Sequence, residues 1–248
     1  MSDSDMTIAE RLEGVEARIA AACGRAGRDR GSVSVVAVSK THGPERVQEA
    51  VDTGLTVFGE NRVQEATQKI PMCPGGLDWH LVGHLQSNKV ARAAHLFNMV
   101  HSVDSLKVMR GLDAAASERG RTVSACVQVN VSGEGCKSGL PPDEVESLLL
   151  ACSGLMHVDV VGLMTIPPLS TEVEHARPFF VALRHLRDRL RILTGFPLDD
   201  LSMGMSTDFE VAIEEGATWI RLGTALFGRR SGKAWRPDFD MGMDTDCI

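Results

Sequence analysis

Tyrosine is absent from this chain of 248 residues, and lysine occurs only six times. The net charge is −7 and the lysines are scattered, whereas a nucleic-acid-binding surface needs clustered Lys and Arg. No segment approaches the ~20 consecutive apolar residues that span a bilayer, and the acidic start is unlike a signal peptide. We therefore expect a cytoplasmic protein with no nucleic-acid or membrane partner.

Disulfide and metal-ligand patterns are also missing. The six cysteines are dispersed and form no C-x-x-C pair, which is typical of reduced thiols in a chain of this length. His80 and His84 lie four positions apart on one predicted strand, a spacing of about 13 Å, which is too wide to share a metal ion. The sequence therefore predicts neither a disulfide scaffold nor a metal site.

A repeating pattern of strands and helices fills most of the chain. An amphipathic helix is predicted over residues 7–27, with Thr7 and Glu10 at the spacing of a capping box. After it, short apolar runs alternate with helical patterns, as in parallel sheets that are buried on both faces. The predicted strands are 34–40, 57–61, 79–84, 99–104, 124–132, 158–166, 200–206 and 219–227.

Eight strands with helices between them predict a (β/α)8 TIM barrel of the α/β class, with one extra N-terminal helix. The length of 248 residues suits one such domain. We assign residues 1–248 to a single domain, with the barrel at 34–228 and a polar tail at 229–248. An open doubly wound sheet is the alternative, but the first strand is not followed by a G-x-G-x-x-G turn.

In such a barrel, chemistry is carried by the carboxyl ends of the strands. Lys40 closes the first apolar strand, where partial desolvation would lower the pKa of its amine and free it to attack an aldehyde. Asn61 closes the second strand and could donate to a ligand oxygen, while Glu60 could orient a neighbouring group. Met164, near the end of the sixth strand, could press on a flat ring. Plain roles also fit: a solvated loop lysine, helix caps and a core methionine.

The last two strands end in small and hydroxylic residues. Barrels often bind a phosphate between the loops after these strands, and Ser206, Gly223 and Thr224 would let it approach the backbone. Arg221 lies in an apolar strand and needs a partner, such as a ligand nitrogen or a carboxylate. Together with Lys40, these features fit a phosphorylated aldehyde, which could be pyridoxal 5'-phosphate (PLP) or a phosphosugar. Tight packing would explain any one of the small residues alone.

Ordered motifs from Val35 to Gly228 carry a family resemblance. With them, the chain resembles the pyridoxal-phosphate homeostasis proteins, also called the YggS/PROSC family. The motifs occupy residues 37–40 (AVSK), 59–65 (GENRVQE), 79–89, 129–139, 162–164 (GLM), 201–206 (LSMGMS) and 221–224 (RLGT).

The resemblance implies a fold-type-III PLP barrel, similar to the N-terminal domain of alanine racemase, that holds PLP as a Schiff base on Lys40. It implies that Ser206, Gly223 and Thr224 hold the phosphate. Members of the family are thought to bind, carry or buffer PLP and to influence vitamin B6 balance. No catalytic reaction is firmly established for them, so the resemblance leaves open whether this chain is an enzyme.

The resemblance also implies how the PLP ring is held. Arg221 would face the pyridine nitrogen, Met164 would contact the ring and Asn61 would lie close by. An arginine at this position, rather than a carboxylate, would keep the ring nitrogen unprotonated and weaken PLP as an electron sink.

The chain departs from the family pattern in two segments. Family members often carry a second lysine two positions after the Schiff-base lysine, commonly followed by proline, and His42 and Gly43 stand there in this chain. A relay of PLP through an amine at that position is therefore not expected. Cys136, next to Lys137, places a thiol in the glycine-rich loop after the fifth strand.

The leading hypothesis is a PLP-binding protein of intracellular PLP homeostasis, with PLP-dependent apoenzymes as candidate partners. We expect a monomer, because the chain lacks the second domain that usually completes a dimeric site. A PLP-dependent racemase or lyase, with His80 or Cys136 as proton carrier, is the first alternative. The missing tyrosine weighs against it, because acid–base groups supply about 10²–10⁴-fold in rate. A Schiff-base aldolase acting on a phosphosugar and a barrel without any ligand are the others.

Overall fold

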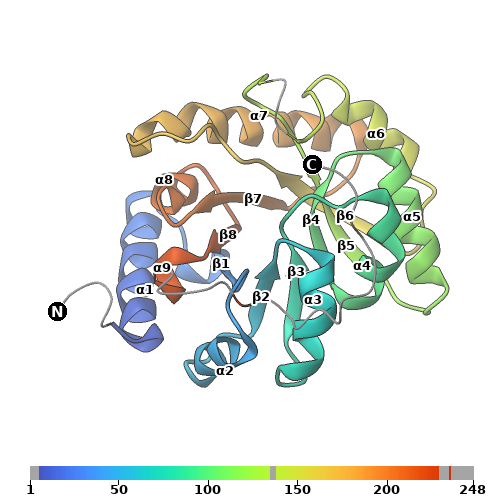
Figure 1. The fold of residues 1–248 in the computed structure, drawn as a ribbon. Coiled ribbons are helices and arrows are strands. Elements are labelled where there is room, and N and C mark those ends of the chain that lie inside the picture. Colours follow the sequence, from blue (N-terminus) through green and yellow to red (C-terminus); the bar gives the residue numbers. More distant parts are fainter. Residues whose placement is uncertain (1–5, 135–137, 229–234, 236–248) are drawn as a thin grey trace.

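Eight parallel strands close into one barrel in the computed structural model of the protein, which describes residues 6–134, 138–228 and 235. The strands follow one another in chain order, and β8 pairs with β1 to close the ring (Figure 1). The predicted TIM barrel is thereby confirmed. The strands are β1 (Ser34–Val38), β2 (Val57–Glu60), β3 (Asp78–Leu81), β4 (Met99–Val103), β5 (Val123–Gln128), β6 (Val158–Met164), β7 (Asp200–Met205) and β8 (Trp219–Leu222).

Helices cover the outside of the barrel (Figure 1). The α-helices are α1 (Ile8–Arg25), α2 (Pro44–Asp52), α3 (Val63–Lys69), α4 (Val90–Leu96), α5 (Leu106–Ser117), α6 (Val145–Cys152), α7 (Arg177–Thr194), α8 (Phe209–Glu214) and α9 (Thr224–Phe227). Short 3-10 helices span Arg30–Ser32, Ile70–Met72, Ser87–Lys89 and Val173–Ala176. Within the described residues, none of the helices has the length and apolar character needed to cross a membrane.

The extra N-terminal helix α1 begins where the sequence predicts it. The Thr7 hydroxyl accepts the backbone N–H of Glu10, and the Glu10 carboxylate accepts the backbone N–H of Thr7, which completes the capping box. One face of α1, with Val15 and Ile19, is buried, and the helix packs against α8 and α9. The helix therefore covers the barrel beside its last strand.

Strand residues alternate between two different environments. Ala37, Phe58 and Leu81 belong to the large apolar core between the strands and the helices. Val36 and Val38 belong to a separate small cluster with Val82, inside the barrel. Because successive side chains point to opposite faces of a strand, this alternation separates an outer apolar core from an interior that can hold polar groups.

Each predicted strand runs past the observed end, and the difference is largest for the fifth and eighth strands. The fifth strand ends at Gln128 rather than at residue 132, and the eighth ends at Leu222 rather than at 227. Gly223, with φ −105° and ψ −83°, leaves the strand conformation, and α9 begins at Thr224. The apolar run of 225–227 packs as a short helix, which periodicity alone does not separate from a strand.

Candidate functional site

The pairing of the first and last strands brings the predicted lysine and phosphate residues to one edge of the barrel. Ala37 pairs with Leu222, so the segments after β1 and β8 leave the barrel side by side. A Cβ atom added to Gly223 would lie 3.6 Å from the carbonyl oxygen of Val38. Lys40 is two residues beyond Val38, and Thr224 follows Gly223 directly. The site that the sequence predicts from distant segments is therefore contiguous at this seam.

The Lys40 side chain is exposed at the rim. The desolvation that the sequence suggested for its amine is therefore not present in this structure. Its two neighbours are more constrained, since Ser39 is fully buried and Thr41 adopts a left-handed backbone conformation with φ 67°. An exposed amine on a constrained turn is accessible to an aldehyde from the barrel mouth.

The loop after β7 is tied to the start of α9. The Ser206 hydroxyl accepts the backbone N–H of Ala225 at 3.1 Å. Gly204, two residues earlier, has φ 94°, and a Cβ atom there would lie 2.6 Å from the Cβ of Ala212, so only glycine fits. Thr224 is exposed, and space around Gly223 is limited only by β1. Hydroxyl and backbone donors thus meet at the place predicted for a phosphate.

Arg221 is buried inside the barrel and finds neutral oxygen partners in the protein. Its guanidinium donates from Nη1 to the Ser202 hydroxyl at 2.7 Å and from Nη2 to the Thr165 carbonyl at 3.0 Å. Burial lowers the pKa of Arg221 to about 10, and the nearby Asp208 carboxylate opposes this shift. Arg221 therefore keeps its positive charge at neutral pH, and no carboxylate of the described residues bonds to it directly.

A chain of polar side chains continues from Arg221 through the barrel interior. The Ser202 Oγ lies 2.7 Å from Nδ1 of His101, and Nε2 of His101 lies 3.0 Å from Nδ1 of His80. Nε2 of His80 is 3.2 Å from the Asp78 carboxylate, at the start of β3. Ser202, His101 and His80 are almost completely buried, while the Asp78 side chain is 41% exposed.

Elementary donor rules assign a direction to this chain. Arg221 can only donate, and the Asp78 carboxylate can only accept. His80 therefore donates from Nε2 to Asp78, and in the tautomer that this contact selects its Nδ1 accepts. His101 then donates from Nε2 to His80 and accepts the Ser202 hydroxyl proton at Nδ1. Burial lowers the pKa of His101 well below its usual value, which keeps the ring neutral. Every hydrogen bond thus runs from Arg221 toward Asp78.

The two remaining predicted residues occupy different surroundings. Met164 is fully buried in the barrel interior with Met99 and Cys126, and it pairs in register with Ser202 of the polar chain. Asn61 is half-buried just beyond β2, and its carbonyl oxygen would lie 2.2 Å from a Cβ atom at Gly83. The close approach of Gly83 fixes the backbone of Asn61.

The structure shows that Glu60 does not cap the helix that follows β2. Helix capping was its plain alternative, but its carboxylate is fully buried and accepts the Ser39 hydroxyl and the Lys69 ammonium, each at 2.7 Å. Glu60 therefore contacts the residue directly before Lys40. Cys136 and Lys137 lie outside the described residues.

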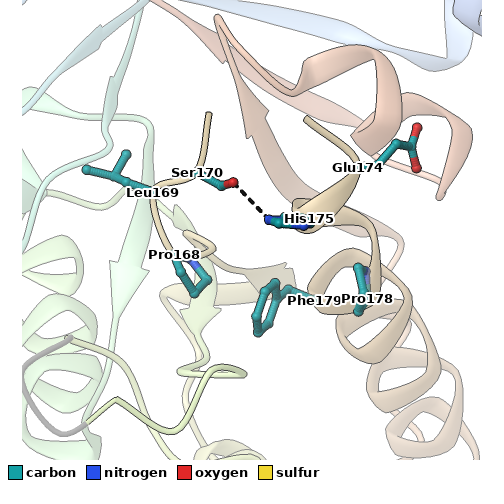
Figure 2. A pocket seen from close by; sticks show the side chains of 7 residues that line it. All are labelled: Pro168, Leu169, Ser170, Glu174, His175, Pro178 and Phe179. Carbon is teal, nitrogen blue, oxygen red and sulfur yellow. Dashed lines mark hydrogen bonds between the residues drawn. The ribbon is translucent and has the colours of Figure 1, made fainter. Parts of the chain in front are cut away.

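A separate apolar pocket of about 460 Å³ lies beside the loop after β6 and the start of α7 (Figure 2). In Figure 2, the side chain of Phe179 faces Pro168, and the Ser170 hydroxyl is 3.0 Å from Nδ1 of His175. Its lining residues are Pro168, Leu169, Ser170, Glu174, His175, Pro178 and Phe179. None of the predicted site residues lines this pocket, so it is distinct from the β1–β8 seam.

Sequence comparison places this site in a family. A family model described as "Alanine racemase, N-terminal domain" matches residues 12–231. A Pseudomonas aeruginosa protein named pyridoxal phosphate homeostasis protein is 45% identical over 225 residues, which cover 90% of this chain and 96% of that relative. The chain belongs to the pyridoxal phosphate homeostasis protein family. An Aquifex aeolicus family member is 43% identical over 226 residues, which cover 91% of this chain and 99% of that protein.

Solved structures agree with this family assignment. PipY of Synechococcus elongatus PCC7942, solved with PLP bound, is 39% identical with a TM-score of 0.78, over 90% of this chain and all of PipY. Alanine racemase from Corynebacterium glutamicum shares the fold at 16% identity and a TM-score of 0.62, and the match covers 87% of this chain but only 60% of the racemase. The racemase therefore resembles this chain in fold alone.

Proposed function

We propose that this protein binds PLP through a Schiff base on Lys40 and acts in intracellular PLP homeostasis in the cytoplasm. The observation that carries this proposal is the β1–β8 seam, which sets the exposed Lys40 turn beside Gly223 and Thr224. When bound, PLP supplies an aldehyde that an amine can capture and a ring that withdraws electrons. The name of the family and the PLP-bound structure of PipY support the same ligand.

The chain's own donors suit the two ends of such a ligand. Ser206, Gly223 and Thr224 offer hydroxyl and backbone groups for a phosphate at the outer end of the seam. Arg221, held by Ser202 on the side of the polar chain, offers its guanidinium to a ring nitrogen. Because a guanidinium donates and does not accept, it leaves that nitrogen unprotonated. We assign Met164 and Asn61 to the sides of the ring.

This donor set favours binding over turnover. An alanine-racemase-type reaction needs two acid–base groups, and the chain contains no tyrosine to serve as one. His80 and His101 are buried in the barrel interior, bonded to each other and to the polar chain rather than to the rim. We therefore propose a PLP carrier or buffer, in monomeric form, with PLP-dependent apoenzymes as recipients.

Borohydride trapping tests the proposal. Purified protein mixed with PLP should turn yellow, and borohydride should bleach it and leave a pyridoxyl group on the peptide that contains Lys40. A Lys40→Ala variant should lose the adduct, whereas a control Lys107→Ala variant, altered at an exposed position on α5, should keep it. A colourless protein, or an adduct that survives in the Lys40→Ala variant, would contradict the proposal.

A further inference from the structure

A buried charged cluster lies outside the barrel wall, directly behind the Lys40 turn. Its members come from the end of β1, the end of β2 and helix α3. Lys69 and Glu60 are completely buried, and the Glu65 side chain is 12% exposed. A lysine without solvent contact is rare unless it is paired. The proposed function uses none of these three side chains, so their burial needs a separate explanation.

The ammonium group of Lys69 uses all of its donors within this cluster. It donates to the Ser39 carbonyl oxygen at 2.9 Å, and to the carboxylates of Glu60 and Glu65 at 2.7 Å each. Lys has three N–H donors, so the group is saturated. Glu65 and Lys69 lie four positions apart on α3, where side chains face each other.

The cluster holds both chain neighbours of Lys40. The Ser39 hydroxyl donates to Glu60 at 2.7 Å, and the Thr41 backbone N–H donates to Glu65 at 2.6 Å. Thr41 has φ 67°, a conformation that β-branched residues rarely adopt unless surrounding contacts impose it. The bond to Glu65 is one such contact, so the direction in which the Lys40 turn leaves β1 depends on this carboxylate.

Trp235 completes the cluster from the C-terminal segment. Its backbone N–H donates to the Thr41 carbonyl at 2.9 Å, and its ring lies 5.2 Å from the Lys69 ammonium. A cation at this distance from an indole face is attracted by it. Thr41 is thereby held through its N–H by Glu65 and through its carbonyl by Trp235.

We propose that Glu65 is a positioning residue for Lys40, supported by Lys69 and Glu60, and that it acts through its hydrogen bond to the Thr41 backbone. This inference rests on the proposed function and extends it, since it names what aims the lysine that captures the aldehyde. The important property of residue 65 is that its side chain reaches the Thr41 N–H, rather than its charge. If that charge is removed, Lys69 still has the Glu60 carboxyl group as a partner.

A pair of variants separates reach from charge. Glu65→Gln keeps the length of the side chain and an acceptor oxygen but removes the charge, whereas Glu65→Asp keeps the charge and withdraws it by one methylene. The exposed Glu49 on α2 provides matched controls as Glu49→Gln and Glu49→Asp. Circular dichroism and thermal unfolding show that each variant is folded at the assay temperature.

The first readout is the rate of PLP capture, followed by absorbance after rapid mixing. Small misplacements of a reacting group cost up to about 100-fold in rate. We expect Glu65→Asp to slow capture by about 10–100-fold and Glu65→Gln to slow it by less than about threefold, with no change in the Glu49 variants. Capture by Glu65→Asp as fast as by Glu65→Gln would overturn the inference.

The second readout needs no PLP. Lys40 is acylated with a small amine-reactive reagent over a range of pH, and the extent of labelling is measured by peptide mass spectrometry relative to the exposed Lys107. The pH profile of Lys40 labelling should change in Glu65→Asp and remain near the wild-type profile in Glu65→Gln. If the wild type captures no PLP but this labelling difference persists, the proposed function fails and the positioning role stands. Unchanged labelling in Glu65→Asp would overturn the positioning role.

Discussion

The Lys40 side and the Arg221 side of the β1–β8 seam are each packed against a different kind of buried polar cluster. Behind Lys40, outside the barrel wall, the Glu60–Lys69–Glu65 cluster is charged, and its ammonium makes three short hydrogen bonds. Next to Arg221, inside the barrel, Ser202 and His101 are uncharged, and the chain continues through His80 to the partly exposed carboxylate of Asp78.

The two regions differ in whether an opposite charge contacts the buried ionisable group. Lys69 meets two carboxylates within hydrogen-bonding distance, so its positive charge is compensated where it lies. Among the described residues no carboxylate contacts His101, and burial, assisted by the positive charge of Arg221, lowers its pKa. Burial favours the uncharged form of a group, and an opposite charge in direct contact opposes that effect.

The largest effect is expected from removing the compensating charge behind Lys40. Lys69→Met should leave two carboxylates without their cation, and breaking a buried ion pair in this way costs about 3–5 kcal/mol. Urea unfolding should show a much lower midpoint than for the control Lys107→Met. His101→Gln, which alters the neutral chain, should cost less than Lys69→Met. An equal or greater loss in His101→Gln would break the distinction between the two regions.

The two regions should also respond to pH with opposite signs. Burial raises the pKa of Glu60 to about 7, despite the opposing effect of Lys69. An acid that binds its proton more tightly when folded contributes stability that is lost as the pH rises from 4.5 through about 7. The lowered pKa of His101 contributes stability that is present above 6.5 and lost as the pH falls below it.

Unfolding free energies of single variants between pH 5 and 8 test these signs. Relative to the wild type, Glu60→Gln should gain stability as the pH rises, and His101→Gln should gain stability as the pH falls. A pKa shift of one unit corresponds to about 1.4 kcal/mol, so changes on the order of 1–3 kcal/mol are expected. Difference profiles with the same slope in both variants would show that the regions do not differ in charge state.

The smallest effect is expected at the exposed end of the neutral chain. Asp78 accepts from His80, and this bond is the main reason that the pKa of Asp78 is lowered. Because the Asp78 side chain is 41% exposed, Asp78→Asn should cost about 1 kcal/mol or less. Nitrogen NMR of the wild type should show His101 protonated on Nε2 at neutral pH, and a proton on Nδ1 would contradict the assigned direction.

The sequence predicts the barrel and the seam but not what supports them. Eight apolar runs specify parallel strands, and closure of the barrel places Lys40 beside Gly223 and Thr224. The ends of the strands were less predictable. At β8, for example, the apolar residues that follow form α9, and four positions are too few to show a helical periodicity. Of the two environments that the sequence left open for Lys40, partial desolvation and solvent, the structure has the solvated one, because the residue lies beyond the end of β1 and is exposed.

Two supporting groups were missed for different physical reasons. His80 was considered as a metal ligand and as a proton carrier, but not as a partner of His101. His101 lies on another strand, so spacing along the chain carried no signal. His80 of β3, His101 of β4 and Arg221 of β8 share the barrel interior, and the alternation of side chains along each strand could have placed them there together. Glu65 and Lys69 do show an i,i+4 pairing, but that spacing is usual for solvated helix faces.

Closure by β8 has a consequence for when the protein acquires its ligand site. The two halves of the site are far apart in the sequence, and the pairing of the first and last strands brings them together. During synthesis the N-terminal half emerges first. A nascent or truncated chain without β8 would therefore present the Lys40 amine without the phosphate loops. Under the proposed function, retention of PLP would report that synthesis has passed β8 and that the barrel has closed.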